Sequence, residues 1–212
     1  MSIFMKVNKS SFILGLQNSN QVKDWFQKNP EQGGLVFLGR SNVGKSTLIN
    51  QLFLKGLARV SKTPGRTQEI NVFDIENTLL FDCPGMGHAK VPGALRDNWE
   101  ELMLSFFEFS TQNHLFIHLM DARHPFMPAD LQLLDFLKKI HINPVMVFCK
   151  IDKLKSQKER HELKLLKDKV IKEYKKIPQI HFISAVDRIG TEELKTALLL
   201  RSGLGKKHEY RA

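Results

Sequence analysis

One octapeptide constrains this chain more than any other feature. It is Gly39-Arg-Ser-Asn-Val-Gly-Lys-Ser46, and it follows the apolar run Leu35–Leu38. A glycine-rich loop of this spacing between a strand and a helix predicts a phosphate-binding P-loop. Its backbone N–H groups turn inward, and the N-terminus of the helix adds positive potential. We expect Lys45 to reach the β- and γ-phosphates of a nucleotide and the Ser46 hydroxyl to bind Mg²⁺.

Short apolar runs alternate with amphipathic stretches along the rest of the chain. The expected strands are Leu35–Gly39, Ile70–Ile75, Thr78–Asp82, His114–Asp121, Pro144–Cys149 and Gln179–Ser184. The expected helices are Lys45–Leu57, Leu95–Phe109, Ala129–Ile140, Gln157–Lys176 and Thr191–Arg201. This alternation predicts an α/β fold in which a mostly parallel six-stranded sheet has helices on both faces. Glu76 and Asn77 leave room only for a tight turn, so one strand should be antiparallel.

Length and composition fit one folded domain over residues 1–212. The chain has 212 residues, of which 42% are hydrophobic, enough for one buried core. We expect residues 1–32 to form an N-terminal extension and residues 203–212 a mobile tail. No signal peptide is recognisable, and no apolar run approaches the roughly 20 residues that span a bilayer. Two cysteines outside any CxxC pattern favour a reducing compartment, so we expect a cytoplasmic protein without membrane insertion.

Three further motifs stand at the ends of expected strands. The carboxylate of Asp82-Cys-Pro-Gly85 can hold a magnesium-bound water while the Gly85 N–H meets a γ-phosphate; alone, the segment could be an ordinary turn. Cys149-Lys-Ile-Asp152 resembles the [NT]KxD motif, whose carboxylate accepts two hydrogen bonds that guanine donates and adenine cannot. Its alternative is a solvated charge pair. Ser184-Ala185 at the next strand end favours guanine, since the Ala185 N–H can meet O6.

The base-reading motif has one unusual residue, Cys149, at the position where Asn or Thr is usual. A thiol is a weak hydrogen-bonding group, so its link to the phosphate loop should be weaker. Lys150 should still lay its aliphatic stem along the base. The motifs therefore predict binding of GTP and GDP.

Several stretches together resemble the EngB family, also called YihA or YsxC, of bacterial ribosome-assembly GTPases. They are the P-loop octapeptide, Thr63-Pro-Gly-Arg-Thr-Gln68, Asp82-Cys-Pro-Gly-Met-Gly87 with Ala89-Lys90-Val91, and Asp121-Ala-Arg-His-Pro125. The resemblance implies a Ras-like core, Thr67 as a second Mg²⁺ ligand in switch I, and a role in maturing the large ribosomal subunit. It also implies a link to cell division and septum formation. Met86-Gly87-His88 departs from the Tyr-Gly-Tyr that the family more often carries.

The predicted site gathers these motifs. The residues expected to contact the nucleotide are Gly39, Arg40, Ser41, Asn42, Val43, Gly44, Lys45, Ser46, Thr47, Gly65, Arg66, Thr67, Gln68, Glu69, Asp82, Cys83, Pro84, Gly85, Cys149, Lys150, Ile151, Asp152, Ile183, Ser184 and Ala185. Lys45, Thr67 and Gly85 are expected to act in catalysis, and Ser46 and Thr67 to bind Mg²⁺.

How water is oriented for hydrolysis stays open. Ras-type enzymes carry a Gln after the DxxG glycine, whereas this chain carries Met86. Either a partner completes the site or another group orients the water. Asn42 is one candidate, because relatives with Asn at this position use K⁺; alternatively it stabilises its own loop. His88 and His124 are expected to be structural or to face a partner, and Arg66 could meet either transition-state charge or the ribosome.

The charge pattern bears on the partner. Thirty-two Lys and Arg against 22 Asp and Glu give a net charge of +10, which favours a polyanion. The lysine-rich segment Lys150–Lys176 is either a solvated face or an rRNA-facing patch. The family resemblance implies that the partner is the large ribosomal subunit or its precursor. We expect a monomer. A metabolic kinase would need an acceptor pocket and an Arg-rich lid, which nothing here resembles; a nucleotide-stabilised scaffold with little hydrolysis stays the alternative.

Overall fold

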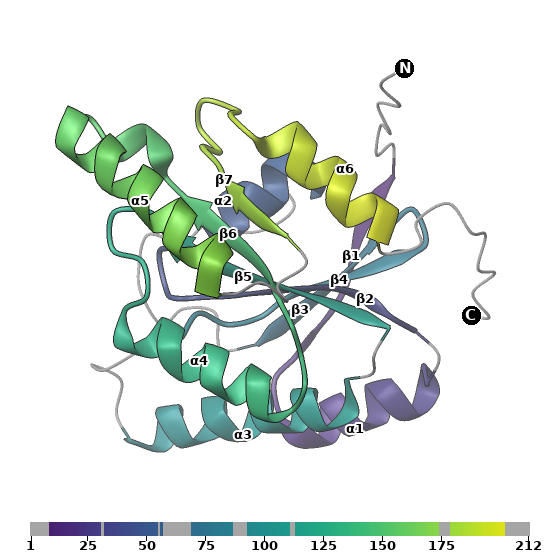
Figure 1. Ribbon diagram of the computed structural model, residues 1–212. Coiled ribbons are helices and arrows are strands. Elements are labelled where there is room, and N and C mark those ends of the chain that lie inside the picture. The colour runs from purple at the N-terminus through teal and green to yellow at the C-terminus, as the bar shows by residue number, and fades with distance from the viewer. Residues whose placement is uncertain are drawn as a thin grey trace.

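The computed structural model describes residues 9–30, 32–54, 56, 69–86, 93–110, 113–173 and 179–201. Within them, one sheet carries the strands in the order β1-β3-β4-β2-β5-β6-β7 (Figure 1). The strands are β1 (Ser10–Leu16), β2 (Gly34–Gly39), β3 (Ile70–Ile75), β4 (Thr78–Asp82), β5 (His114–Asp121), β6 (Val145–Cys149) and β7 (Ile180–Phe182). The helices are α1 (Ser19–Lys28), α2 (Lys45–Ile49), α3 (Gly93–Phe109), α4 (Pro128–Lys139), α5 (Gln157–Glu173) and α6 (Thr191–Arg201).

The directions of the strands confirm the predicted mostly parallel α/β sheet. β4, β2, β5, β6 and β7 are parallel neighbours, and β3 is antiparallel to both β1 and β4. β3 is therefore the one reversed strand, as the tight turn predicted. Glu76 and Asn77 in that turn have φ values of 47° and 69°. Two positive φ values in a two-residue loop give a type I′ turn, whose twist matches that of the paired strands.

The predicted number of six strands is wrong, because the N-terminal extension contributes a seventh. β1 is an edge strand whose Phe12 is exposed, so it lacks a clear alternation of buried and exposed side chains. α1 begins at a cap where Asn18 Oδ1 accepts from the Gln21 N–H at 3.0 Å, and it buries Val22 and Phe26. Phe26 lies edge-on to Phe106 of α3 at 5.6 Å between ring centroids. The cap and the i, i+4 apolar pair were the signals that could have found this helix.

The bounds of the predicted elements agree with the structure or differ from it by a few residues. β3, β4 and β5 have the bounds predicted from their apolar runs. The helix expected over Lys45–Leu57 changes after Ile49 into a π-helical turn, η1 (Asn50–Leu54), and its last predicted residue lies outside the described residues. No helix in the described part of the chain combines the length and hydropathy that crossing a membrane requires.

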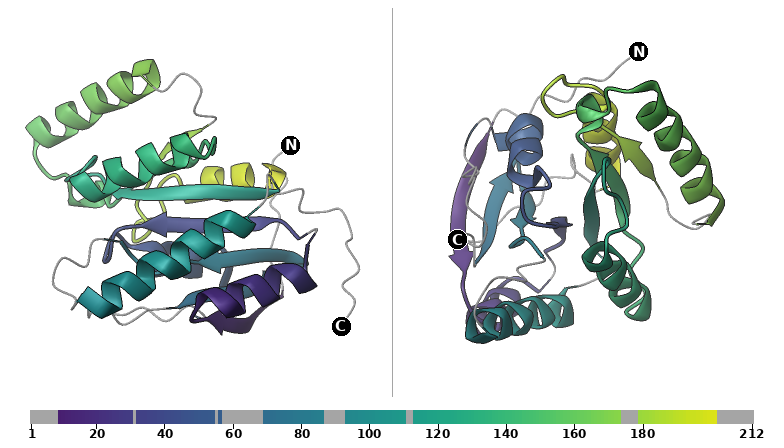
Figure 2. Two further views of the ribbon diagram at one scale, coloured as in Figure 1. Left: turned by 90° about the horizontal axis from the view of Figure 1, so that it is seen from below. Right: turned by 90° about the vertical axis from the view of Figure 1, so that its left-hand side faces the viewer.

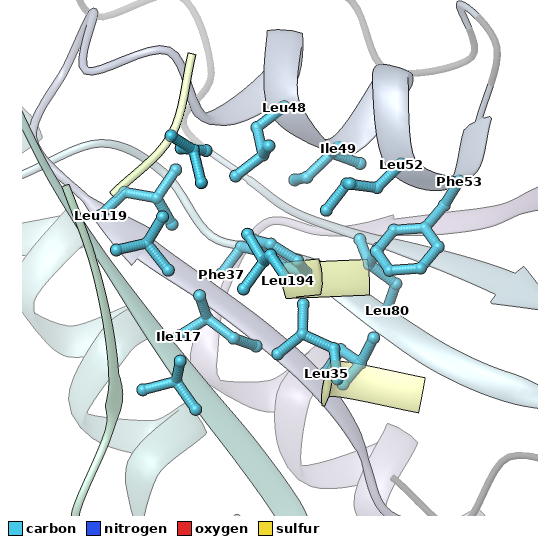
Figure 3. Close-up of a cluster of buried hydrophobic side chains, with 14 of the residues drawn as sticks. Leu35, Phe37, Leu48, Ile49, Leu52, Phe53, Leu80, Ile117, Leu119 and Leu194 are labelled. Atoms are coloured by element: carbon cyan, nitrogen blue, oxygen red, sulfur yellow. The ribbon is translucent and has the colours of Figure 1, made fainter. Parts of the chain in front are cut away.

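Helices cover both faces of the sheet, as the sequence predicts (Figure 2). Successive side chains of a strand point to opposite faces, so β2, buried throughout, supplies both cores. Leu35 and Phe37 pack with α2, η1 and α6, where Leu194 joins them (Figure 3). Val36 and Leu38 pack under α1, α3 and α4 on the other face. Because β4, β2, β5, β6 and β7 run in the same direction, their carboxyl ends lie along one edge of the sheet. Ligands bind at this edge in open α/β sheets.

Candidate functional site

The phosphate loop joins the end of β2 to α2, and its glycines are needed at two positions. A Cβ on Gly39 would lie 2.8 Å from the carbonyl oxygen of Leu119, so no side chain fits there. Gly44 has φ +107°, which an L side chain rarely adopts. Asn42 has φ 61°, in the left-handed region that Asn tolerates better than most residues. The sequence therefore fixes the conformation of this loop residue by residue.

Three residues predicted for phosphate and Mg²⁺ lie together where the loop meets β4. Lys45 is buried in the first turn of α2, and its ammonium forms an ion pair with Asp82 at the end of β4. Ser46 Oγ donates to Asp82 Oδ2 at 3.4 Å. A hydroxyl and a carboxylate are the hard oxygen ligands that suit Mg²⁺, which usually keeps waters and substrate phosphate as its other ligands. The donor set therefore fits Mg²⁺, which would stabilise the negative charge of the phosphates.

The segment after β4 continues beside the phosphate loop. The Met86 N–H donates to the Gly39 carbonyl at 3.0 Å, and the Ser41 N–H donates to the Met86 carbonyl at 3.1 Å. A Cβ on Gly85 would lie 2.9 Å from the Ser41 backbone nitrogen, so the two backbones touch at that point. The DxxG motif is thus fastened directly to the loop that should hold the phosphates.

The side chain of Met86 points away from this edge. It is buried in the cluster that β2 and β4 form with α1, α3 and α4. A thioether buried in a core cannot orient an attacking water. Met86 therefore does not take the role that Gln has in Ras-type enzymes, and both expectations from the sequence, a partner that completes the site or another group that orients the water, stay open.

The base-reading motif follows β6 and makes two contacts across the edge. Lys150 has φ 66° and directs its ammonium to the Asn42 carbonyl at 2.6 Å and to Asp121 Oδ2 at 3.1 Å. Asp152 lies in the 3₁₀ turn η2 (Ile151–Lys153), and its Oδ1 accepts from Ser184 Oγ at 3.0 Å. The motifs after β6 and β7 are therefore brought together, as predicted.

The protonation state of Asp152 suits guanine. Burial raises the pKa of Asp152, but hydrogen bonds from Ser184 and Lys153 outweigh it, and the net pKa lies below its usual value. The carboxylate is ionised at neutral pH, so its oxygens could accept from the N1–H and N2–H₂ groups that guanine presents. Ile183 is buried and Ala185 partly buried beside it, both against the core under α6.

Cys149 makes no side-chain bond to the phosphate loop. Its Sγ lies 4.0 Å from the Val147 carbonyl of its own strand, and the residue is buried. Burial raises the pKa of the Cys149 thiol far above its usual range, and the same cause acts on Cys83. The side-chain link between the base loop and the phosphate loop comes instead from Lys150.

The structure turns the side chain of Arg40, a predicted nucleotide contact, toward α4. Arg40 Nε lies 3.2 Å from Asp130 Oδ1, and Nη2 donates to the His124 carbonyl at 2.8 Å. Asp130 is fully buried and also accepts from the Met127 N–H at 3.0 Å. Sequence reasoning missed Asp130; an acidic residue in the first turn of a helix just after the Asp-x-Arg-His segment was the available signal.

Two further predicted residues, Glu69 and Thr47, are described by the structure, and others lie outside the described residues. Glu69 lies with its carboxylate over Gly15, and its Oε2 accepts from Gln17 Nε2 at 3.1 Å, so this side chain contacts β1 and its end. Thr47 is exposed in the first turn of α2. Those outside the described residues are Gly65, Arg66, Thr67, Gln68, Gly87 and His88.

Comparison with known proteins decides the family. A sequence model described as "50S ribosome-binding GTPase" matches residues 35–150. The GTP-binding protein EngB of Mycoplasmopsis synoviae is 44% identical over 161 residues, covering 75% of this chain and 82% of that protein. EngB of Thermosipho africanus is 34% identical over 204 residues, covering 94% and 100%. The chain belongs to the EngB family. The resemblance found in the sequence is thereby confirmed.

Solved structures agree with this membership. A crystal structure of an EngB protein matches with a TM-score of 0.64 and 25% identity over 81% of this chain and 99% of that one. Era, solved with MgGDPNP and a fragment of 16S ribosomal RNA, matches with a TM-score of 0.66 and 25% identity over 85% and 59%. The fold is that of a Ras-like GTPase, and as an EngB-family protein the chain binds and hydrolyses GTP.

Proposed function

We propose that this chain is a GTP-driven switch that binds the large ribosomal subunit, or its precursor, in the GTP form and leaves after hydrolysis. We further propose that the protein is a monomer in the cytoplasm. Its role on the ribosome would support normal cell division and septation. The description of the matching family as a 50S ribosome-binding GTPase supports the choice of partner. Era, a structural relative solved with ribosomal RNA, supports the class of partner.

The observation that carries the proposal is the backbone pairing between the phosphate loop and the DxxG segment. Two hydrogen bonds, from Met86 N to Gly39 O and from Ser41 N to Met86 O, join the two segments. A γ-phosphate bound by the phosphate loop and by the Gly85 N–H would hold the loop and the DxxG segment in one fixed arrangement. Its loss would be transmitted to the residues that follow Met86, which is how GTPase switches change shape.

Each group at the edge then has a role. Lys45 would neutralise charge on the β- and γ-phosphates, and Ser46 and Thr67 would hold Mg²⁺, with the Asp82 carboxylate available to accept from a water bound to that ion. Asp152 and the Ala185 N–H read guanine. Asn42, exposed on the phosphate loop, would contribute to a K⁺ site near the phosphates. Met86 lies in the core, so K⁺ or a group brought by the ribosome would complete the hydrolytic site.

The basic surface of α5 supports an RNA partner. Lys158 and Lys164 are exposed on this helix, and Lys153 and Lys155 are exposed just before it. Lysines that neutralise RNA phosphates release counterions, so binding should weaken as salt rises.

The proposal is tested by co-sedimentation of the chain with large ribosomal subunits. The arms are a non-hydrolysable GTP analogue and GDP, each at low and high salt, for the native chain and Lys45→Ala. We expect pelleting with the analogue to exceed pelleting with GDP, to fall with salt, and to lose its nucleotide dependence in Lys45→Ala. Equal pelleting with both nucleotides would refute the switch.

A matched pair of variants tests the basic surface. Lys158→Ala with Lys164→Ala on α5 should weaken pelleting, whereas Lys138→Ala with Lys139→Ala, two exposed lysines at the end of α4, should not. Equal losses in the two pairs would mean that net charge, and not this face, attracts the particle.

A further inference from the structure

We propose that Asp121 and Arg123 are positioning residues for guanine-nucleotide binding. Arg123 fixes Asp121, and Asp121 holds the Lys150 ammonium against the phosphate loop. The inference rests on the role proposed above for the Lys150–Asp152 motif. It gives a function to the Asp121-Ala-Arg-His-Pro125 segment at the end of β5, whose Arg123 the nucleotide site has so far left unexplained.

The first link is a two-pronged ion pair between Arg123 and Asp121. Arg123 Nε donates to Oδ1 at 2.9 Å, Nη2 donates to Oδ2 at 2.6 Å, and the Arg123 backbone N–H donates to Oδ1 at 3.1 Å. The Asp121 side chain is 9% exposed and that of Arg123 is 39% exposed. A planar guanidinium that meets both carboxylate oxygens fixes the orientation of the carboxylate as well as its charge.

The charge on Asp121 is secured by the same contacts. Burial raises the pKa of Asp121, but hydrogen bonds from Arg123 and Lys150 outweigh it and hold the pKa far below its usual range. The carboxylate is therefore ionised at neutral pH, and the Lys150 ammonium faces an anion.

The second link runs from Asp121 to Lys150 and on to the loop. Lys150 Nζ lies 3.1 Å from Asp121 Oδ2 and 2.6 Å from the Asn42 carbonyl oxygen. Its Cε passes 3.8 Å from where a Cβ on Gly44 would stand. Because the ammonium is held at both contacts, the aliphatic stem is stretched across the loop before a base arrives. A lysine left free would lose rotamer entropy on binding.

The contact of Lys150 with the phosphate loop is more important for joining the two loops in a chain that has Cys149 at the first position of the base-reading motif. The thiol contacts its own strand, at the Val147 carbonyl, so it does not tie the base loop to the phosphate loop. Of the side-chain hydrogen bonds that the described residues make between the two loops, the one from Lys150 to Asn42 carries the tie. Asp121 supports the lysine that makes it.

A double-mutant cycle tests the inference by titration of fluorescent GDP. Asp121→Asn should weaken GDP binding about tenfold, since a charge-assisted contact to Lys150 is lost. Arg123→Met should weaken it about threefold and Arg123→Lys less, since Lys keeps the charge but not the fork. Asp135→Asn and Arg201→Met, exposed residues on α4 and α6, are the controls and should bind GDP as the native chain does.

The cycle is completed in a Lys150→Met background, and thermal unfolding of each variant verifies that it is folded. If Asp121 acts through Lys150, Asp121→Asn will cause no further loss there. An undiminished tenfold loss in that background would overturn the inference while leaving the guanine site intact. Native affinity in Lys150→Met would overturn the proposed site itself. Should Asp121→Asn fail to fold, Arg123→Met carries the same test, because its side chain lies at the surface.

Discussion

The ion pair between Arg40 and Asp130 should be worth a measurable part of the stability of this fold. Replacing Arg40 with Met removes the cation and leaves a fully buried carboxylate whose Oδ1 and Oδ2 lay 3.2 and 3.1 Å from Arg40 Nε. Removing one partner of a buried pair costs about 3–5 kcal/mol. Arg40 is 22% exposed, and water screens it, so we expect a loss of about 2–3 kcal/mol. For a chain of this size that lowers Tm by roughly 4–12 °C.

Urea and thermal unfolding of four variants measure this effect. They are Arg40→Met, Asp130→Asn, the double variant, and Arg201→Met as a control at an exposed position at the end of α6. The double variant should be less destabilised than Arg40→Met, because no unpaired charge stays buried. The reasoning is refuted if Arg40→Met unfolds with the control, or if the two single losses simply add.

Three further predictions concern the loop, the ion and the thiols. Gly85→Ala forces a Cβ to 2.9 Å from the Ser41 backbone nitrogen and so displaces the Gly85 N–H, and it should weaken a GTP analogue about tenfold more than GDP, which has no γ-phosphate; equal losses would contradict the γ-phosphate role. GTP hydrolysis should be faster in K⁺ than in Na⁺ at equal ionic strength, and Asn42→Ala should abolish the difference; identical turnover of the native chain in both salts would exclude the ion. Cys83 and Cys149 should react with a thiol reagent at pH 8 only as the chain unfolds, because burial raises the pKa of both; rapid labelling of the native protein would contradict this.

The parts of the site that sequence reasoning found are those whose chemistry fixes residue types at a fixed spacing. The phosphate loop needs glycine at particular backbone angles, and Gly44 at φ +107° shows why the motif can be read locally. The strands that end in Asp82 and Asp121 are rich in apolar residues along their length, because parallel strands are buried on both faces. Both therefore had bounds that the sequence predicted.

The parts that were missed depend on contacts between distant positions. Arg40 and Asp130 are 90 residues apart, and Asp121 and Lys150 are 29 apart, so no periodicity relates them. Among the described residues, β1 pairs with β3, and its own weakly alternating sequence does not indicate this pairing. The helix after the phosphate loop changes to a π-turn at Asn50, where intrinsic helix propensity favours no such change. The two ion pairs and the pairing of β1 depend on tertiary contacts, which local sequence patterns do not contain.

The base preference of an Asp152→Asn variant tests most directly whether this edge of the sheet is the guanine site. The carboxylate is held by Ser184 Oγ at 3.0 Å and is ionised at neutral pH, so Asp152→Asn changes one acceptor to a donor with little change of shape. Affinities of the native chain and the variant for GTP and xanthosine triphosphate, titrated side by side, give the answer. We predict that the variant loses GTP binding by on the order of a thousandfold and gains xanthosine triphosphate binding. Equal GTP affinity in the two proteins would contradict the assignment of this edge of the sheet as the guanine site.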